Sequence, residues 1–237
     1  MSAKIRPGAR AAALSLALCA ATAGATGPSP RARLFARLPD WTGLWQTEAA
    51  AQAVSGAGAD RAAQGASSLP ANYKKCRPTG FPTVMNVPLS DFMFELLVTP
   101  EQTLLVSTDG TVRHIYTDGR PHPKPEDLWP TPTGDSIGHW EGATLIVDTI
   151  AREPGPIYPF PDSPVLSAKA HFTERIRRVD GETLEDAMLI EDPAQLPRPL
   201  SSTIRYTRIH DVDRLISIDC EHDRNTVGDH HEIAPPR

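Results

Sequence analysis

The sequence predicts an all-β protein whose antiparallel strands form a meander that closes into a barrel of about eight to ten strands. Pairs of an acidic residue and a glycine punctuate the chain, and such pairs supply the positive φ angles of tight hairpins. The segments between them alternate apolar and polar residues, which is typical of a sheet with one packed and one solvated face. Closure is favoured because it removes exposed strand edges, and a two-sheet sandwich is the alternative.

The first two strands are expected at 41–46 and 91–98. In the second strand, alternate residues such as Phe94 and Leu96 fall on one face, as they do when a strand packs on a core. Residues 47–65, between the two strands, are rich in alanine and predict a short helix or a flap.

Four hairpins are expected after these strands. The turns of the first three are Asp109-Gly110, Glu141-Gly142 and Asp180-Gly181. The strands that they join are expected at 103–108 with 111–116, at 136–140 with 144–149, and at 168–179 with 182–191. Residues 211–213 are expected to turn a strand at 203–209 back into a last strand at 214–220. Consecutive strands should then be neighbours in space.

The N-terminus has the pattern of a secretory signal. Basic residues precede an apolar run at 11–21 that is too short to span a bilayer, and small residues suit cleavage after Ala23 or Ala25. We therefore expect a periplasmic or secreted protein. The expected division of the chain is a signal peptide at 1–25, an N-terminal tail at 26–38, a β-barrel domain at 39–225 and a C-terminal tail at 226–237.

The charge of the chain excludes one class of partner. The formal net charge is −5, and loss of the basic signal peptide makes the mature chain more acidic still. A nucleic-acid-binding protein needs the opposite sign to meet phosphates, so no nucleic-acid partner is expected. The mature chain has no second apolar run of membrane length, so no membrane contact is expected after signal removal. The expected partner is a small-molecule ligand, and the sequence does not predict an oligomeric state.

Two cysteines, Cys76 and Cys220, are left after removal of the signal peptide. In an oxidising compartment such a pair predicts one disulfide, and two buried free thiols are the alternative.

Titratable side chains are concentrated at 116–149. His139 and Glu141 share one face of an expected strand, and we expect that face to point into the barrel. A carboxylate that orients an imidazole makes a general base near neutral pH, which predicts catalytic roles for both residues. Asp148 could face His139 across the hairpin and support it in the same way. The alternatives are a solvated pair at the hairpin and an Asp148 that caps the end of its strand.

Asp118, Arg120 and His122 follow a strand and precede a proline-rich loop, which suits functional groups at a barrel mouth. Arg120 could steady a developing anion, since its planar fork suits planar oxygen anions. Asp118 is also explained as the turn residue before Gly119. The two prolines beside His122 hold its backbone extended, so the ring could be ordered for binding or could serve loop packing.

Tyr116, Trp129 and Trp140 offer contact surface for an apolar or aromatic ligand. The sequence lacks H-E-x-x-H, paired C-x-x-C, P-loop and G-x-S-x-G motifs, so no cofactor and no metal are expected. A third reading, with haem or a metal bound through His139 or His122, stays open. His171 and His210 each sit singly in a strand and read as surface or packing residues.

The segment Trp41-Thr-Gly43-Leu-Trp45 resembles the Gly-x-Trp start of lipocalin and other calycin barrels. This resemblance implies that the tryptophan plugs one end of the barrel and that the glycine permits a tight bend.

A longer resemblance covers nearly all of the mature chain. It rests on the following segments: Trp41–Trp45, Cys76-Arg-Pro-Thr-Gly-Phe-Pro, Tyr116-Thr-Asp-Gly-Arg-Pro-His-Pro, Ser136–Thr149 with its Ser-Ile-Gly-His-Trp-Glu-Gly start, and Cys220-Glu. These segments resemble a family of exported bacterial proteins without a settled function. The chain departs from that pattern at Ala143, where the family has Asp, and at Phe81, where it tends to have Met.

Two functions fit these residues. In the first, the barrel binds a small apolar or aromatic molecule and transforms it as a lyase, isomerase or hydrolase. His139 would then move a proton with support from Glu141 or Asp148, and Arg120 would steady an anion. The alternative is a non-catalytic periplasmic carrier that uses the same residues for binding alone.

Overall fold

The computed structural model describes residues 29–48, 79–86, 93–157 and 163–216, together with the short strands β12 (Thr226–Val227) and β13 (His230–His231). The expected signal peptide, nearly all of the expected helix or flap at 47–65, and both Cys76 and Cys220 lie outside these residues. In the described part, no helix is both long enough and apolar enough to cross a membrane.

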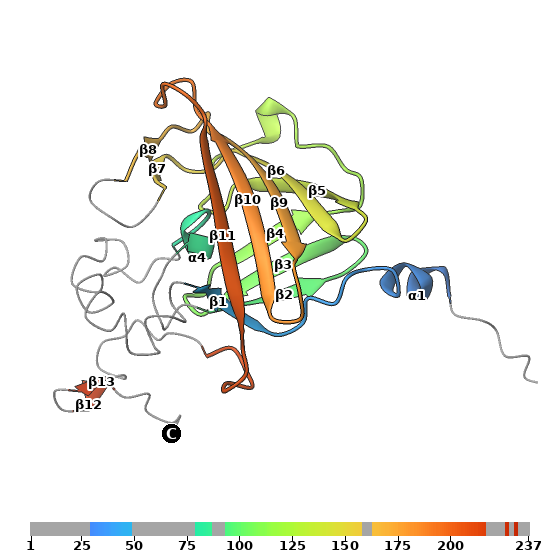
Figure 1. Cartoon of the computed structure of the whole chain (residues 1–237). Coiled ribbons are helices and arrows are strands. Elements are labelled where there is room, and N and C mark those ends of the chain that lie inside the picture. Colours follow the sequence, from blue (N-terminus) through green and yellow to red (C-terminus); the bar gives the residue numbers. More distant parts are fainter. Residues whose placement is uncertain are drawn as a thin grey trace, which may run out of the picture.

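Nine strands form a closed barrel, which confirms the predicted fold class (Figure 1). Round the barrel the order is β1-β11-β10-β9-β6-β5-β4-β3-β2, and β1 closes the ring because it pairs with both β11 and β2. The strands are β1 (Leu44–Thr47), β2 (Phe94–Val98), β3 (Gln102–Ser107), β4 (Val112–Tyr116), β5 (Asp135–Glu141), β6 (Thr144–Ile150), β9 (His171–Arg178), β10 (Thr183–Glu191) and β11 (Leu200–Ile209).

Besides β12 and β13, the described elements outside the ring are α1 (Pro30–Phe35), α4 (Thr83–Asn86), the 3-10 turn η3 (Pro125–Asp127), β7 (Gly155–Pro156) and β8 (Val165–Leu166). We call the end where β11 finishes and β1 begins the lower end, and the end where β11 begins the upper end, as they appear in Figure 1.

Three of the predicted hairpins are present. The β3–β4, β5–β6 and β9–β10 pairs are antiparallel and are joined at the expected acidic-glycine turns. Gly110 and Gly142 have φ values of +80° and +62°, the left-handed region that glycine enters without a steric penalty. Residues 211–216 contain no strand, and the rest of the expected last strand lies outside the described residues.

One junction departs from a simple meander. β4 and β5 are parallel and share only the pairs Ile115–Ser136 and Tyr116–Ile137. Parallel neighbours cannot be joined by a tight turn, so the chain between them needs a long connection. That connection, residues 117–134, includes η3 and runs outside the barrel (Figure 1). Its path brings His122 beside Asp135 of β5 and Asp148 of β6.

Aromatic residues close both ends of the barrel. At the lower end, the rings of Trp41 and Trp140 meet edge to face at 5.1 Å, and Trp45 Nε1 donates to the Trp41 carbonyl at 3.1 Å. At the upper end, residues 79–86 bring Phe81 against Phe172, with ring centroids 5.0 Å apart. Trp41, Trp45, Phe81 and Phe172 are almost completely buried, and Trp140 is partly buried against them. The described interior is therefore filled by its own side chains.

A charged group lies in the middle of this interior. Arg113 on β4 and Glu174 on β9 are both fully buried. Arg113 donates from both terminal nitrogens to Glu174, at 2.9 and 2.5 Å, and also to Ser136 and Thr149. Its guanidinium lies 3.7 Å from the centre of the Phe81 ring. One side chain thus connects β4, β5, β6, β9 and the upper-end segment.

Asp186 on β10 belongs to the same group and is also fully buried. As a carboxylate it finds no hydrogen-bond donor among the described side chains. Burial, followed by the negative charge of Glu174, raises the pKa of Asp186 well above its usual range and outweighs the attraction of Arg113. The protonated form of Asp186 is therefore favoured, and with it the three side chains would be neutral as a group.

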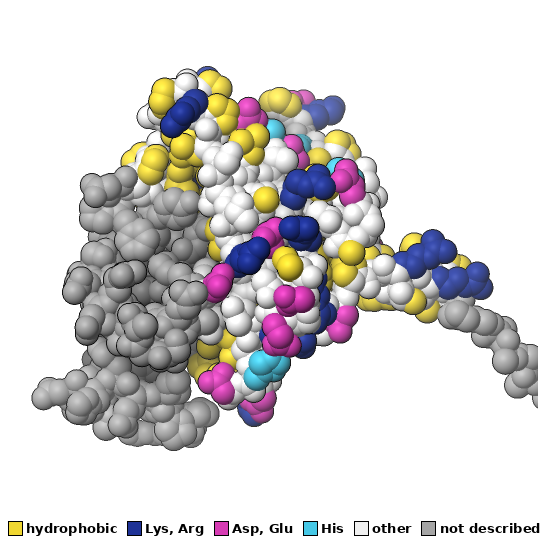
Figure 2. All heavy atoms as spheres, viewed as in Figure 1, with side chains coloured by type: hydrophobic (Ala, Val, Ile, Leu, Met, Phe, Trp, Pro, Cys, Tyr) yellow, Lys and Arg dark blue, Asp and Glu magenta, His cyan; other side chains and the backbone are white. Residues whose placement is uncertain are grey.

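The outer face is polar and mixed in charge. Figure 2 shows basic and acidic side chains interspersed over β9, β10 and β11. Glu185 takes part in this pattern, since it accepts from Arg177 at 2.7 Å and from Arg205 at 3.2 Å. Exposed pairs of this kind add little stability, so the buried group matters more to the fold.

Replacing Arg113 tests the importance of the buried pair. The change Arg113→Met should lower the free energy of unfolding by about 3–5 kcal/mol, because it leaves the Glu174 carboxylate buried without its partner. Urea unfolding followed by tryptophan fluorescence measures the loss. The matched control is Arg175→Met, which removes an exposed pair with Glu141 and should cost less than about 1 kcal/mol. Equal losses for the two variants would contradict the assignment.

Replacing Asp186 tests its proton. A carboxyl group whose folded pKa is raised binds its proton more tightly in the folded protein, so stability falls as the pH rises above about 4 toward the folded pKa. Asp186→Asn removes this dependence while an amide still donates to Glu174. The stability of the variant relative to the wild type should therefore increase from about pH 5 upward, until the pH passes the folded pKa of Asp186. A constant difference in urea unfolding across that range would show that Asp186 is ionised in the folded protein.

Candidate functional site

A cluster of imidazoles and carboxylates lies on the outer face near the upper end. The connection 117–134 places His122 between β5 and β6, where Nδ1 lies 2.5 Å from Asp135 Oδ1 and Nε2 lies 2.9 Å from Asp148 Oδ1. The His122 side chain is only 18% exposed. The flanking prolines that favour an extended backbone hold the ring in this position.

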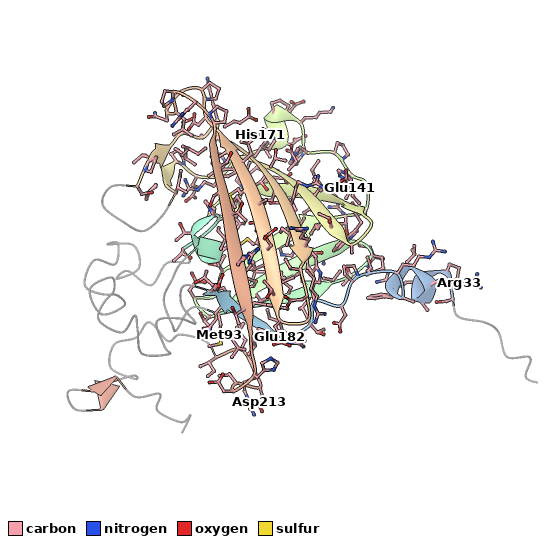
Figure 3. The ribbon with its side chains drawn as sticks, in the orientation of Figure 1. Arg33, Met93, Glu141, His171, Glu182 and Asp213 are labelled. Carbon is pink, nitrogen blue, oxygen red and sulfur yellow. The ribbon has the colours of Figure 1, made fainter. Side chains whose placement is uncertain are left out.

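A second imidazole meets the same carboxylate. His171 Nε2 lies 2.7 Å from Asp148 Oδ2, and His171 Nδ1 lies 3.4 Å from Glu191. His171 and Glu191 are direct partners in the β9–β10 register, so backbone pairing fixes their approach. The five side chains run in the order Asp135, His122, Asp148, His171 and Glu191, and we call them the imidazole–carboxylate chain. Figure 3 labels His171 at the upper end of the barrel.

The pKa values of two members are shifted in opposite directions. Partial burial would raise the pKa of Asp148, but hydrogen bonds from His171 and then His122 outweigh it, and the pKa is lowered. Partial burial would lower the pKa of His171, but the hydrogen bond and charge of Asp148, assisted by Glu191, outweigh it, and the pKa is raised. Both shifts favour an imidazolium paired with a carboxylate.

This geometry can hold and pass protons. All four ring nitrogens face a carboxylate, so each ring can carry two protons, and Asp148 bridges the Nε2 atoms of both rings. His171 and Asp148 are 36% and 42% exposed, so a molecule in solution can reach them. An accessible imidazole held by a carboxylate is the usual donor or acceptor of protons in catalysis.

His139 and Glu141 lie elsewhere. Their side chains are 67% and 52% exposed, 3.6 Å apart, so the prediction that they face the interior is wrong. Successive side chains of a strand point to opposite faces, and Ser136 and Gly138 occupy the inward positions of β5. Ser136 is buried. At Gly138 there is no room for a side chain, since a Cβ atom there would lie 3.0–3.2 Å from three neighbouring atoms. Residues on the other face, including His139, must point to solvent. Figure 3 labels Glu141 on this outer side.

The expected approach of Asp148 to His139 is also wrong. The partner of His139 across the β5–β6 hairpin is Ile146, whereas Asp148 lies opposite Ile137. Asp148 instead meets His122, which is another of the predicted residues.

The residues at the start of the connection 117–134 form a second group. Arg120 donates to both carboxylate oxygens of Asp118, at 2.9 and 2.6 Å, and its guanidinium lies 4.1 Å from the centre of the Tyr116 ring. The hydrogen bond from Arg120 lowers the pKa of Asp118. Gly119 has a φ of +85°, so Asp118 also fills its alternative role as a turn residue.

The two predicted tryptophan contacts have different surroundings. Trp129 lies on the same connection as His122 and is 70% exposed. Trp140 packs against Trp41 at the lower end, so it serves the core and does not face solvent as a binding surface. Of the two, only Trp129 offers an exposed ring, on the connection that also carries His122.

The sequence reasoning missed several charged residues. Glu174 and Asp186 occupy the inward positions of their strands, in phase with Phe172 and Met188. An acidic residue in phase with buried apolar residues is a signal that could have found them. His171 and Asp135 gave no such signal, because only strand pairing and the path of the connection bring them to Asp148.

No family model matches the chain, and no curated protein or solved structure matches it either. The resemblance to exported bacterial proteins is therefore carried by the motifs alone. Within the described ranges, no three His, Cys, Asp or Glu side chains are arranged to hold a metal ion.

The pH dependence of stability tests the ion pair between His171 and Asp148. A raised histidine pKa adds stability below about pH 6.5 that is lost as the pH rises through the folded pKa. A lowered aspartate pKa adds stability above about pH 4 that is lost on acidification through the folded pKa. The stability advantage of the wild type over His171→Asn should thus be largest between about pH 4 and 6.5 and shrink toward about pH 9.

Thermal unfolding of both proteins across this range provides the measurement. His139→Asn is the matched control, because His139 is exposed and its nearest carboxylate is 3.6 Å away. If His171→Asn and His139→Asn show the same small effect at every pH, the ion pair does not form in solution.

Proposed function

We propose that the protein is an exported enzyme that transforms a small molecule by proton transfer at the imidazole–carboxylate chain. The observation that supports this most directly is the bridging of two imidazoles by Asp148 at 2.9 and 2.7 Å. Export rests on the signal-like N-terminus, which predicts a periplasmic or secreted protein.

His171 is the better candidate for the group that touches substrate. It is twice as exposed as His122, and its Nδ1 atom has the longest contact of the chain, 3.4 Å to Glu191. Its raised pKa extends the pH range over which the ring is protonated, as a general acid must be. In the proposed step, Nδ1 gives its proton to the substrate and the ring becomes neutral. Nε2 keeps its proton and donates it to Asp148.

His122 and Asp135 do not touch the substrate in this proposal. They position Asp148, which holds His171. His122 donates to Asp148 Oδ1 and thereby keeps the carboxylate aimed at His171, while Asp135 fixes the His122 ring from its other side. A catalytic base or acid held in this way loses less rotational freedom when it reacts.

The surroundings favour an apolar or aromatic substrate with a polarisable oxygen. Trp129 offers an exposed aromatic surface on the connection that carries His122. Arg120 belongs to the same connection, and its guanidinium could meet a developing oxyanion by exchanging one of its contacts with Asp118. Lyase, isomerase and hydrolase reactions all contain a proton-transfer step of this kind.

A non-catalytic binding protein is the second candidate. It is favoured by the fact that every ring nitrogen of the chain already has a carboxylate partner, so the cluster could simply fasten the connection 117–134 to the barrel. A ligand would then rest on the exposed side chains of the connection, and no proton would move.

Exchange of hydrogen for solvent deuterium separates the two candidates. The probe is phenylacetone, a ketone with an aromatic ring. His171 gives a proton to its carbonyl oxygen while water removes an α-hydrogen to form the enol, and return to the ketone takes up deuterium from the solvent. Proton NMR follows the loss of the α-hydrogen signal. General acid–base catalysis is worth roughly 10²–10⁴-fold, so wild-type protein should exceed buffer by at least about 100-fold. His171→Asn should return the rate close to that of buffer, and the rate should fall as the pH rises through the raised pKa of His171.

His139→Asn is the control and should exchange at the wild-type rate, since that exposed ring lies outside the chain. Equal rates for His171→Asn and wild type would exclude His171 as the acid. Binding of the ketone with no exchange above buffer would favour the carrier.

A further inference from the structure

Aliphatic side chains gather on the outer face of β2, β3 and β4, three neighbouring strands of the barrel (Figure 1). They are Leu97 on β2, Leu104 and Val106 on β3, and Val112 on β4, and we call them the aliphatic surface. Leu97 and Val112 are 40% and 43% exposed, and Leu104 and Val106 are half-buried. The wet face of an antiparallel sheet normally carries polar residues, so four aliphatic side chains together call for a partner.

The strand register makes this surface continuous. Leu97 is the direct partner of Leu104, and Val106 is the direct partner of Val112. Direct partners in an antiparallel pair lie about 5 Å apart on the same face. Leu104 and Val106 are two residues apart on β3 and share the outer face, since Leu105 between them is buried in the core. The four side chains therefore form one block.

The opposite wall of the barrel has a different outer face. Acidic and basic side chains are interspersed over β9, β10 and β11 (Figure 2), where Arg177 and Arg205 both pair with Glu185. The aliphatic surface contains no charged side chain. A continuous apolar patch on one wall, beside a charged outer face elsewhere, is typical of a surface that contacts another molecule.

Two polar side chains stand at opposite corners of the aliphatic surface. Glu95 is the direct partner of Val106, on the β2 side, and His114 is the direct partner of Leu104, on the β4 side. Because these two pairs are one step of two residues apart along β3, Glu95 and His114 mark the ends of a diagonal. One corner thus carries an acid and the other an imidazole.

The ring of His114 is held in a fixed orientation. Its Nδ1 atom lies 3.2 Å from the side-chain oxygen of Gln102, and its plane stacks on the Tyr116 ring with centroids 5.9 Å apart. No ion pair within the described part of the chain involves Glu95 or His114. Both corners can therefore take a partner of opposite charge.

We propose that the aliphatic surface binds a second copy of this chain in a two-fold symmetric dimer. A two-fold axis makes every contact reciprocal, so a surface that binds itself must be self-complementary. When two such sheets pack face to face with their strands crossing at a large angle, the ends of the diagonal meet in exchanged order. Glu95 then meets the partner's His114 at one corner, and His114 meets the partner's Glu95 at the other. The aliphatic block of each copy covers that of the other.

A lipid surface fits these side chains less well. Apolar patches that bind membranes are bordered by lysine and arginine, which meet anionic headgroups. The outward positions of β2, β3 and β4 carry neither residue type, and Glu95 would face the headgroups with the wrong sign. The dimer contact also leaves β6 and β9 free, so it does not depend on the proposed proton transfer at Asp148 and His171.

Sedimentation velocity of the full chain tests the proposal. Between about 1 and 300 μM the sedimentation coefficient should rise with concentration, with a dissociation constant in the micromolar range, as for interfaces of small area. Leu97→Glu places a charge without a partner in the middle of the contact and should raise the dissociation constant by about tenfold or more. Val112→Lys should act in the same direction and serves if Leu97→Glu does not fold.

The matched control is Leu189→Glu. Leu189 is 37% exposed on the outer face of β10, outside the proposed contact, so this variant should dimerise as the wild type does. Circular dichroism checks the fold of each variant. A single monomeric species throughout the concentration range would overturn the proposal, and so would the same dissociation constant for Leu97→Glu and Leu189→Glu.

An exchange of charges tests the two-fold pairing itself. Glu95→Lys and His114→Glu should each weaken the dimer, because each leaves both corners without an opposite charge. The double variant restores a lysine opposite a carboxylate at both corners, so its dissociation constant should return toward that of the wild type. A double variant that dimerises no better than the weaker single variant would overturn the proposed arrangement.

Discussion

The buried pair of Arg113 and Glu174 is the interaction on which the rest of the barrel depends. A charge in the interior is tolerated only when it is paired and its remaining hydrogen-bonding groups are satisfied. Arg113 meets this condition by reaching Glu174 on β9, Ser136 on β5 and Thr149 on β6 at once. These contacts fix how β4, β5, β6 and β9 are aligned with one another around the barrel. The Phe81 ring over the guanidinium extends the same constraint to the upper-end segment. Asp186, whose raised pKa favours its protonated form, belongs to the same buried group, and the described apolar side chains pack around it.

A filled interior moves the candidate chemistry to the outside, and the parallel junction between β4 and β5 is what makes this possible. A hairpin at that point would have left no chain to cover β5 and β6. The connection 117–134 instead brings His122 onto Asp135 and Asp148, and the pairing of β6 with β9 brings His171 to the same carboxylate. The imidazole–carboxylate chain therefore depends on the parallel β4–β5 junction, because that junction requires the long connection that carries His122. The Gly43–Trp45 segment also has two roles at the lower end. Trp45 closes the core, and Arg208 lies against both Gly43 and the Trp45 ring.

The local features of the fold were predictable and the long-range ones were not. The turns at Gly110 and Gly142 depend on two adjacent residues, so their hairpins could be read directly. Period-2 alternation defines two faces of a strand but does not say which one is inside, and this is why His139 was placed inward. The inward face of β5 is the one that carries Gly138, whose missing side chain matters only once Ile115 and Ile146 lie against it. His122 and Asp148 were both selected, but their contact depends on the path of the connection, which no local pattern reveals.

The most direct test of the proton-transferring chain is the imidazole titration of His171, followed by nitrogen-15 NMR in wild-type protein and in Asp148→Asn. An ordinary histidine titrates at about pH 6.5. If Asp148 stabilises the His171 imidazolium, the titration midpoint of His171 in the wild type lies above that value, and it falls when the Asp148 carboxylate becomes an amide. The Nε2 proton should also exchange with water faster in the variant, since its acceptor is weakened. An unchanged midpoint in Asp148→Asn would show that the two side chains are not coupled, and the proposed acid would then have no basis.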